Sequence, residues 1–207
     1  MTWNEVLAAL PLIAILRGVT PKEAPGVAAA LLDAGFLCVE VTLNSPSPFE
    51  SIAAIRARFD DRMLIGAGTV LTPEDVRRAA EAGARVIISP NTSPAVIAAT
   101  KDAGLVSVPA VFTPTEAFAA LAAGADALKF FPAEAASPAV LRSLRAVLPS
   151  EVRLFPVGGV EAPAMPAWRA AGAAGFGLGG SVYRAGMGPG EARARALGLA
   201  AAWRACA

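Results

Sequence analysis

The sequence predicts an α/β protein in which strands and helices alternate along the chain, as in a (β/α)8 barrel of the TIM type with an extra N-terminal helix. The first observation is a repeated Ala-Gly dipeptide that ends an alanine-rich segment and precedes a short apolar run. Its glycines are Gly35, Gly83, Gly104, Gly124 and Gly172. Their separations are 48, 21, 20 and 48 residues, so each long gap has room for one more unit. Because glycine commonly follows a helix, each dipeptide indicates a helix that leads into a strand.

The second observation is a set of eight short apolar runs, which we expect to be parallel strands. They span residues 12–17, 36–42, 63–68, 85–89, 105–109, 126–131, 153–157 and 174–178. Several expected helices open with proline in the first turn, in TPKEA, TPEDV, SPAVI, TPTEA and SPAVL. A helix before the first strand and another near 190–205 are expected as additions. An open doubly wound sheet is the alternative, but it would leave unpaired edge strands.

Length and composition favour one compact domain over residues 1–207. The chain is 55% hydrophobic, and its 18 Lys and Arg against 17 Asp and Glu give a net charge of +1. That balance does not favour binding to nucleic acid or to a membrane surface. The first sixteen residues carry Glu5, lack a basic start and are interrupted by Pro11. We therefore expect a helix and a strand there, not a signal peptide or membrane span, and a soluble cytoplasmic protein.

The absence of histidine restricts the chemistry. With none in the sequence, Ser-His-Asp and Cys-His catalysis and the usual imidazole metal sites are excluded. The two cysteines, Cys38 and Cys206, are too far apart in sequence to suggest a disulfide framework or a metal pair. Acid–base catalysis must therefore use a carboxylate, a lysine, the single tyrosine or a cysteine. We expect neither a metal nor a cofactor.

Two charged residues stand in runs that should be buried. Lys129 lies in DALKFFPAEA, and Glu40 lies in LCVEVTL. The lysine could reach water from a strand end, and the glutamate could be an ion-pair partner. Alternatively, burial makes the amine lose its proton more readily and act as a nucleophile. If both side chains face the interior of one barrel, the pair supplies a nucleophile and a proton shuttle.

Two glycine-rich stretches follow the last two expected strands. They are VGGV at 157–160 and GLGGS at 177–181. Their backbone N–H groups lie at the loops where barrels of this type hold phosphate, although glycines can also serve only tight turns. These features together predict a sugar-phosphate ligand whose carbonyl lies near Lys129 and Glu40. Arg17 and the hydroxyl of Thr69 are candidates for holding a carboxylate beside that carbonyl.

Seven motifs, in order over nearly the whole chain, resemble the class I pyruvate-dependent aldolases of 2-keto-3-deoxy-6-phospho-sugar acids. They are ILRG, VEVTLNSP, IGAGTVL, SPN, LKFFPA, PVGGV and GLGGSVYRAG. The resemblance implies that Lys129 forms the Schiff base and that Glu40 is the acid/base. It also implies carboxylate contacts at Arg17 and Thr69. The implied phosphate contacts are Gly159, Gly179 and Gly180, and the implied assembly is a homotrimer.

Two branches of this family differ at positions that can be compared in this sequence. The gluconate type has an arginine after EVTL and a threonine before the Gly-Gly pair of VGGV, where this chain has Asn44 and Val157. LNSP and VGGV are similar to the galactonate type, which cleaves its phosphorylated keto sugar acid to pyruvate and glyceraldehyde 3-phosphate. Loss of the threonine hydroxyl makes tolerance of both C4 epimers plausible. That type also has serine after GLG, whereas here Gly180 precedes Ser181, so a phosphate contact from the Ser181 side chain stays open.

Other functions fit part of the pattern. A gluconate-type or 4-hydroxy-2-oxoglutarate aldolase would use the same lysine. A phosphate-binding barrel isomerase would use Glu40 as a base without covalent chemistry, and a sugar-phosphate sensor would bind its ligand without turnover. Trapping of a pyruvate adduct with borohydride separates the aldolases from the other two.

Overall fold

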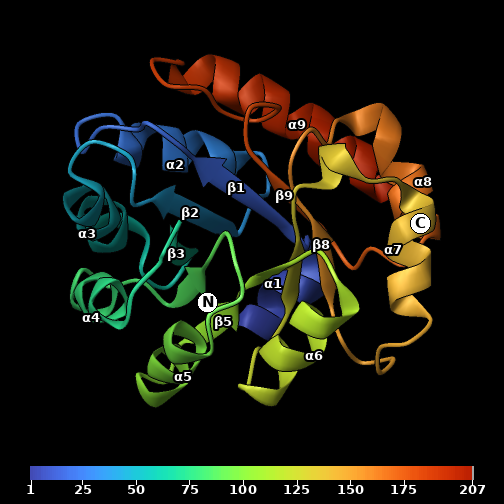
Figure 1. Ribbon diagram of the computed structural model, residues 1–207. Coiled ribbons are helices and arrows are strands. Elements are labelled where there is room, and N and C mark those ends of the chain that lie inside the picture. The colour runs from blue at the N-terminus through green and yellow to red at the C-terminus, as the bar shows by residue number, and fades with distance from the viewer. Residues whose placement is uncertain (207) are drawn as a thin grey trace.

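The computed structural model describes residues 1–206, and it confirms the expected α/β architecture of parallel strands with helices outside them (Figure 1). The strands are β1 (Leu12–Leu16), β2 (Cys38–Thr42), β3 (Leu64–Gly68), β4 (Val86–Ile88), β5 (Val106–Val108), β6 (Ala110–Val111), β7 (Leu128–Phe130), β8 (Leu154–Pro156) and β9 (Phe176–Leu178). The α-helices are α1 (Trp3–Ala9), α2 (Ala24–Asp33), α3 (Pro48–Phe59), α4 (Pro73–Glu81), α5 (Pro94–Asp102), α6 (Pro114–Ala122), α7 (Pro138–Arg145), α8 (Met165–Ala170) and α9 (Pro189–Ala205). Two short 3-10 helices, η1 (Ala133–Ala135) and η2 (Ala162–Ala164), precede α7 and α8.

The strands form two parallel sheets. One has the order β5-β4-β3-β2-β1-β9, and the other has the order β6-β7-β8. Pro109 separates β5 from β6, and proline has no N–H to give to a strand ladder. The Asp126 N–H donates to the Ser107 carbonyl, and a parallel bridge pairs Val157 with Gly177, so backbone contacts link the two sheets at both junctions.

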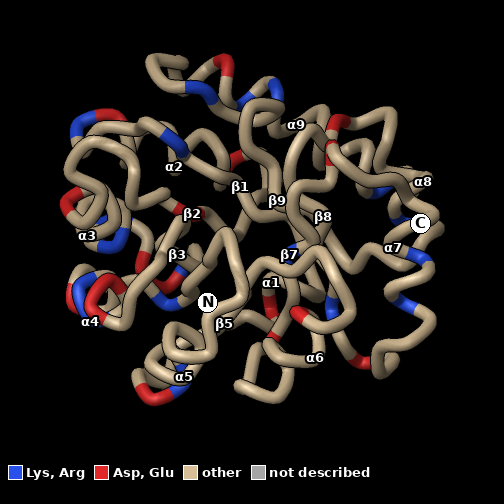
Figure 2. The backbone as a smooth tube through the Cα atoms, in the orientation of Figure 1, with Lys and Arg blue, Asp and Glu red and all other residues tan. Residues whose placement is uncertain are grey.

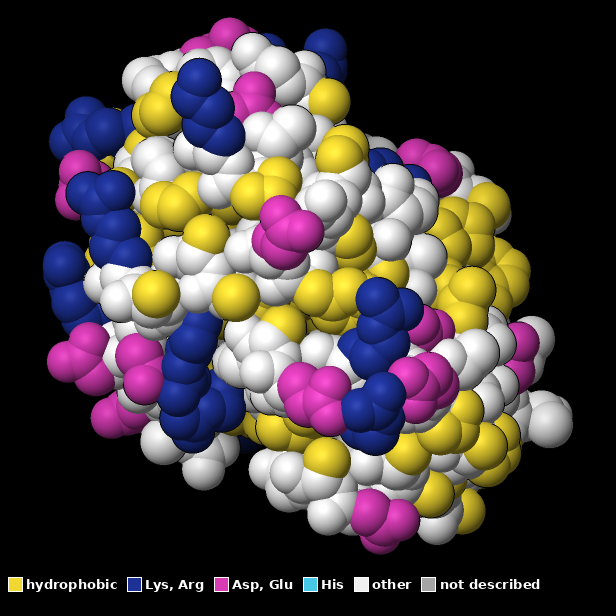
Figure 3. Space-filling view, turned by 90° about the vertical axis from the view of Figure 1, so that its left-hand side faces the viewer, with side chains coloured by type: hydrophobic (Ala, Val, Ile, Leu, Met, Phe, Trp, Pro, Cys, Tyr) yellow, Lys and Arg dark blue, Asp and Glu magenta, His cyan; other side chains and the backbone are white. Residues whose placement is uncertain are grey.

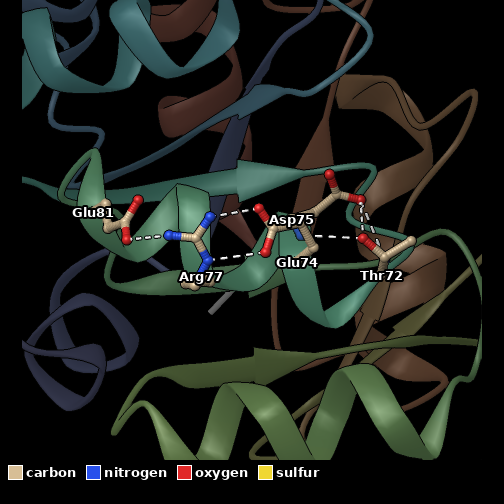
Figure 4. Close-up of polar contacts among 5 residues, drawn as sticks. All are labelled: Thr72, Glu74, Asp75, Arg77 and Glu81. Carbon is tan, nitrogen blue, oxygen red and sulfur yellow. Dashed lines mark hydrogen bonds and ion pairs between the residues drawn. The ribbon is translucent and has the colours of Figure 1, made fainter.

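Four of the five proposed helix starts are confirmed. Helices α4, α5, α6 and α7 each begin at the proline of the Thr-Pro or Ser-Pro motif. In α4 the Thr72 hydroxyl accepts the Asp75 N–H, and the Asp75 carboxylate accepts the Thr72 N–H in return (Figure 4). Arg77 lies between Glu74 and Glu81 on the same helix. This reciprocal capping fixes where α4 begins, and the ion pairs stabilise the helix beyond its first turn.

The helix expected at TPKEA begins later than proposed. The Glu23 carboxylate accepts hydrogen bonds from the N–H and the hydroxyl of Thr20, which holds residues 20–23 in a turn. Helix α2 starts at Ala24, and its first-turn proline is Pro25. Pro25 cannot donate a backbone hydrogen bond, so the helical series starts with bonds to the Glu23 carbonyl.

The amino ends of the strands are closed by α1. Val6 on this helix is fully buried, and it packs in one cluster with inward-facing side chains such as Ile13, Cys38 and Phe155. A larger apolar cluster lies between the strands and the outer helices. Because α1 fills the amino end, open space for a ligand is expected at the carboxyl ends of the strands.

Charged residues lie mainly on the helices and loops (Figure 2). Among the described strands, Glu40 and Lys129 are the only charged residues. On the face that carries α3 and α4, basic and acidic side chains lie interspersed (Figure 3), with pairs such as Arg56–Asp60 and Arg77–Glu74. None of the helices in residues 1–206 combines the length and apolar composition that crossing a bilayer requires.

Candidate active site

A pocket of about 630 Å³ opens at the carboxyl ends of β1, β7, β8 and β9. The sequence-predicted residues that line it are Arg17, Lys129, Gly159, Gly179, Gly180 and Ser181. They come from strands and loops far apart in sequence, so the fold brings together the proposed nucleophile and the proposed phosphate loops. Glu40 and Thr69 do not line this pocket, and their positions are described below.

Lys129 lies at the centre of β7, with Ala110 and Phe155 as its neighbours across the sheet. Its side chain is only 6% exposed, and the Nζ atom lies 4.9 Å from the centroid of the Phe131 ring. Phe131 shares the inward face with Lys129 because side chains alternate along a strand, while Phe130 points into the outer core. The amine is therefore held in a largely apolar wall that opens only to the pocket.

Glu40 lies on β2 between Ile15 and Gly66 of the adjacent strands, and it is 2% exposed. Its carboxylate packs against the backbone of Gly68. A Cβ atom added to Gly68 would lie 2.8 Å from the Glu40 Cδ and closer still to Oε1. The glycine therefore provides the space that the carboxyl group occupies.

Burial and charge act in opposite directions on this pair. Burial lowers the pKa of the Lys129 ammonium, the negative charge of Glu40 raises it, and Arg17 lowers it. For Glu40, burial raises the pKa of the carboxyl group, while Lys129 and Arg17 lower it. Within residues 1–206 the two groups form no direct ion pair. Burial thus favours a neutral amine and a protonated carboxyl group, the forms needed for nucleophilic attack and proton donation.

Two glycine pairs form the outer wall of the pocket. Gly158 and Gly159 have φ values of +106° and +65°, and a Cβ on Gly159 would lie 2.9 Å from the Glu134 side chain. Gly179 and Gly180 lack such constraints, since an added Cβ would have no neighbour nearer than 3.9 Å. Within the described chain, no backbone carbonyl accepts the N–H of Gly159, Gly179 or Gly180. Unpaired backbone N–H groups of this kind suit an anion.

Arg17 follows β1, and its exposed side chain lines the pocket. Thr69 follows β3 directly after Gly68, is half-buried and has a φ of +58°. A β-branched residue rarely adopts this left-handed conformation, so the position is strained. Strain of this kind is concentrated at functional sites, which favours a role for Thr69 beside the Glu40 carboxyl group.

Sequence reasoning missed two carboxylates. Glu134 on η1 and Glu161 before η2 both line the pocket near the Gly-Gly pair of VGGV. Each follows the carboxyl end of a strand, and that position was the available signal. In the described part of the chain, no three His, Cys, Asp or Glu side chains gather as ligands for a metal ion would.

A parallel α/β fold with a buried lysine, a neighbouring glutamate and an anion-suited glycine wall at the carboxyl ends of its strands defines a class of carbonyl-handling enzyme sites. The sequence model of the family described as KDPG and KHG aldolase matches residues 3–187. The chain belongs to this family.

Individual relatives cover most of the chain. A probable 2-dehydro-3-deoxy-6-phosphogalactonate aldolase of Rhizobium meliloti is 49% identical over 94% of this chain and 92% of its own. The 2-dehydro-3-deoxy-6-phosphogalactonate aldolase of Escherichia coli is 50% identical over 86% of this chain and 87% of its own. A solved structure described as native KDPGal superposes with a TM-score of 0.94 at 47% identity, over 95% and 96% of the two chains.

The contact between Gly68 and Glu40 generates a prediction. We expect Gly68→Ala to lower the free energy of unfolding by about 1–3 kcal/mol, because the added methyl group displaces a buried carboxyl group. In a Glu40→Ala background the same change should cost much less, since its main contact is gone. Urea unfolding of the four proteins measures both costs. Equal costs in the two backgrounds would show that Glu40 does not fill the space beside Gly68.

Proposed function

We propose that the protein is a metal-independent class I aldolase that cleaves 2-dehydro-3-deoxy-6-phosphogalactonate to pyruvate and glyceraldehyde 3-phosphate. The observation that carries this proposal is the buried amine of Lys129, which faces the pocket next to the buried carboxyl group of Glu40. The names of the relatives from Rhizobium meliloti and Escherichia coli support the choice of substrate.

The reaction begins when the neutral Lys129 amine attacks the C2 carbonyl. A proton moves from nitrogen to oxygen to give a carbinolamine, and Glu40 donates a second proton as water leaves, which forms an iminium ion. Ionised Glu40 then takes the proton of the C4 hydroxyl. The C3–C4 bond breaks, its electrons form an enamine with the iminium, and glyceraldehyde 3-phosphate departs. Protonation of the enamine at C3 and addition of water release pyruvate and the free amine.

Groups around the pocket would hold the two charged ends of the substrate. The carboxylate at C1 lies next to the reacting carbonyl, where the Arg17 guanidinium and the Thr69 hydroxyl are the proposed donors. The phosphate at C6 is proposed to bind the free N–H groups of Gly159, Gly179 and Gly180, with Ser181 at the same edge. Both ends being held, the C3–C4 bond stays beside Lys129 and Glu40.

We infer that the two sheets form one closed (β/α)8 barrel in a single domain. Three features support closure. β5 and β6 are separated only by Pro109 and continue as one strand. The Lys129 N–H donates to the Pro109 carbonyl at 2.9 Å, and Val157 bridges to Gly177 on the other side. Closure would satisfy the edges that an open sheet leaves unpaired.

A homotrimer is the proposed assembly. Phe112 lies just before α6 and is 38% exposed, and Phe118 lies on α6 and is 47% exposed. Exposed apolar surface of this kind favours an interface. A designed cube-shaped protein cage made by fusing symmetric oligomeric domains shares 47% identity and a TM-score of 0.94 with this chain. Sedimentation equilibrium should give three times the mass of the chain, and Phe118→Glu should shift it towards monomer. A wild-type monomer at micromolar concentration contradicts this assembly.

The proposed nucleophile can be identified by trapping. Pyruvate with borohydride should add one reduced pyruvate to Lys129 and leave the other two lysines, Lys22 and Lys101, unmodified. Lys101 forms an ion pair with Asp126, whereas burial lowers the pKa of Lys129 and favours its neutral amine. Peptide mass analysis locates the adduct.

Lys129→Ala should abolish trapping and lower kcat by at least about 10³-fold. Lys101→Ala is the matched control and should retain wild-type trapping and kcat. If the Lys129 variant cleaves substrate at the wild-type rate, the Schiff-base mechanism is wrong. Turnover without any trapping would favour an isomerase, and binding without turnover would favour a sensor.

Val157 is the proposed determinant of epimer preference. It lines the pocket directly before Gly158, and its side chain offers only methyl groups. We expect Val157→Thr to raise the ratio of kcat/KM for the gluconate epimer over the galactonate epimer about tenfold, because a hydroxyl can hydrogen-bond one C4 configuration. Coupled assays of pyruvate release from both epimers measure the ratio, with Val157→Ala as the apolar control. An unchanged ratio in the threonine variant assigns the preference elsewhere.

A further inference from the structure

Ser45 is a buried polar residue in the exposed loop that follows β2. Its neighbours Asn44 and Pro46 are exposed, but Ser45 itself is only 8% exposed. Its Oγ atom accepts the Gly18 N–H at 2.8 Å, lies 3.0 Å from the Thr42 hydroxyl, and can donate to the Leu16 carbonyl at 3.5 Å. A serine hydroxyl has one donor and two acceptor sites, so these three contacts satisfy it when Thr42 donates.

The two backbone contacts flank Arg17. The Leu16 carbonyl belongs to the peptide group before Arg17, and the Gly18 N–H belongs to the peptide group after it. On its other side, Gly18 packs so closely on Ala185 that an added Cβ would lie 2.9 Å from the Ala185 side chain. Gly18 also has a φ of +79°, which favours glycine. The backbone of Arg17 is thus held between the loop after β2 and the loop after β9.

The Arg17 side chain lacks comparable support. It is exposed, and within residues 1–206 its guanidinium forms no ion pair. Its direction into the pocket must therefore come from its backbone. A guanidinium binds a carboxylate through two parallel hydrogen bonds, and that arrangement tolerates little misplacement.

We propose that Ser45 is a positioning residue, which fixes the backbone on both sides of Arg17 so that the guanidinium meets the substrate carboxylate. This inference rests on the proposed function, in which Arg17 binds that carboxylate. It assigns to the loop after β2 a role in binding the pyruvate half of the substrate, although no side chain of that loop lines the pocket. Ser45 does not contact the reacting atoms, so its effect should appear in binding and not in the chemical steps.

Ser45→Ala tests this role. We expect KM for the phosphorylated substrate to rise about fivefold, the factor that corresponds to losing one neutral hydrogen bond, with kcat changed less than about twofold. The pyruvate concentration for half-maximal borohydride trapping should rise by the same factor. The inhibition constant of glyceraldehyde 3-phosphate should not change, because that product carries the phosphate but no carboxylate.

Ser51→Ala is the matched control. Ser51 on α3 is also fully buried, and its hydroxyl has no hydrogen-bond partner in the described chain. Its loss should leave KM and trapping at wild-type values. If Ser45→Ala does not fold, Ser45→Cys keeps a similar shape with a weaker hydrogen-bonding group and should give a smaller shift in the same direction.

A double-mutant cycle with Arg17→Ala decides whether Ser45 acts through Arg17. We expect Ser45→Ala to add little to KM once Arg17 is absent. Independent, multiplicative effects overturn the inference, as does an unchanged KM or equal weakening of pyruvate and glyceraldehyde 3-phosphate. Wild-type protein that traps no pyruvate overturns the proposed function itself. Wild-type trapping with a Ser45→Ala variant that matches it leaves that function standing and removes only the positioning role.

Discussion

The placement of one ammonium group in the sheet interior is the constraint on which the site depends. Parallel strands covered by helices exclude water from both faces, so a charge there is destabilised. Glu40 on β2 partly offsets this cost for Lys129 without a direct ion pair. The charge of Glu40 raises the pKa of Lys129, and the charge of Lys129 lowers the pKa of Glu40. Burial therefore favours the neutral form of each group while the partner's charge favours the ionised form, and proton transfer between substrate and protein uses both forms.

Glycine makes the rest of the site possible in three physically different ways. Gly68 leaves room for a carboxyl group that a methyl group would displace. Gly159 adopts a positive φ and packs on Glu134, so its backbone and its surroundings both require the absence of a side chain. Gly179 and Gly180 are free of both requirements, and what they provide is access to their N–H groups. A small side chain would be tolerated sterically at Gly180, so packing in the described chain does not require glycine there.

The elements best predicted from the sequence were those governed by local chemistry. Lys129 and Glu40 were recognisable because charge contradicts an apolar strand, and α4 and α6 because proline opens their first turns. Long-range contacts could not be predicted in this way. Nothing near Ser45 in the sequence indicates that it contacts Gly18. In the sequence Glu134 resembles a solvated loop glutamate, and only the structure shows that it packs on Gly159. The start of α2 was misplaced because the Thr20–Glu23 turn competes with a helical first turn.

The charges that line the pocket explain how a nearly neutral protein can bind a highly charged ligand. Three cations, Arg17, Lys129 and Arg184, face two carboxylates, Glu134 and Glu161, so the wall is close to neutral once the amine has lost its proton. Attraction by net charge is therefore weak, and the proposed binding of a phosphorylated acid relies on directed hydrogen bonds from the guanidinium and the loop N–H groups. Such donors act over short distances and only when they are oriented correctly towards the ligand.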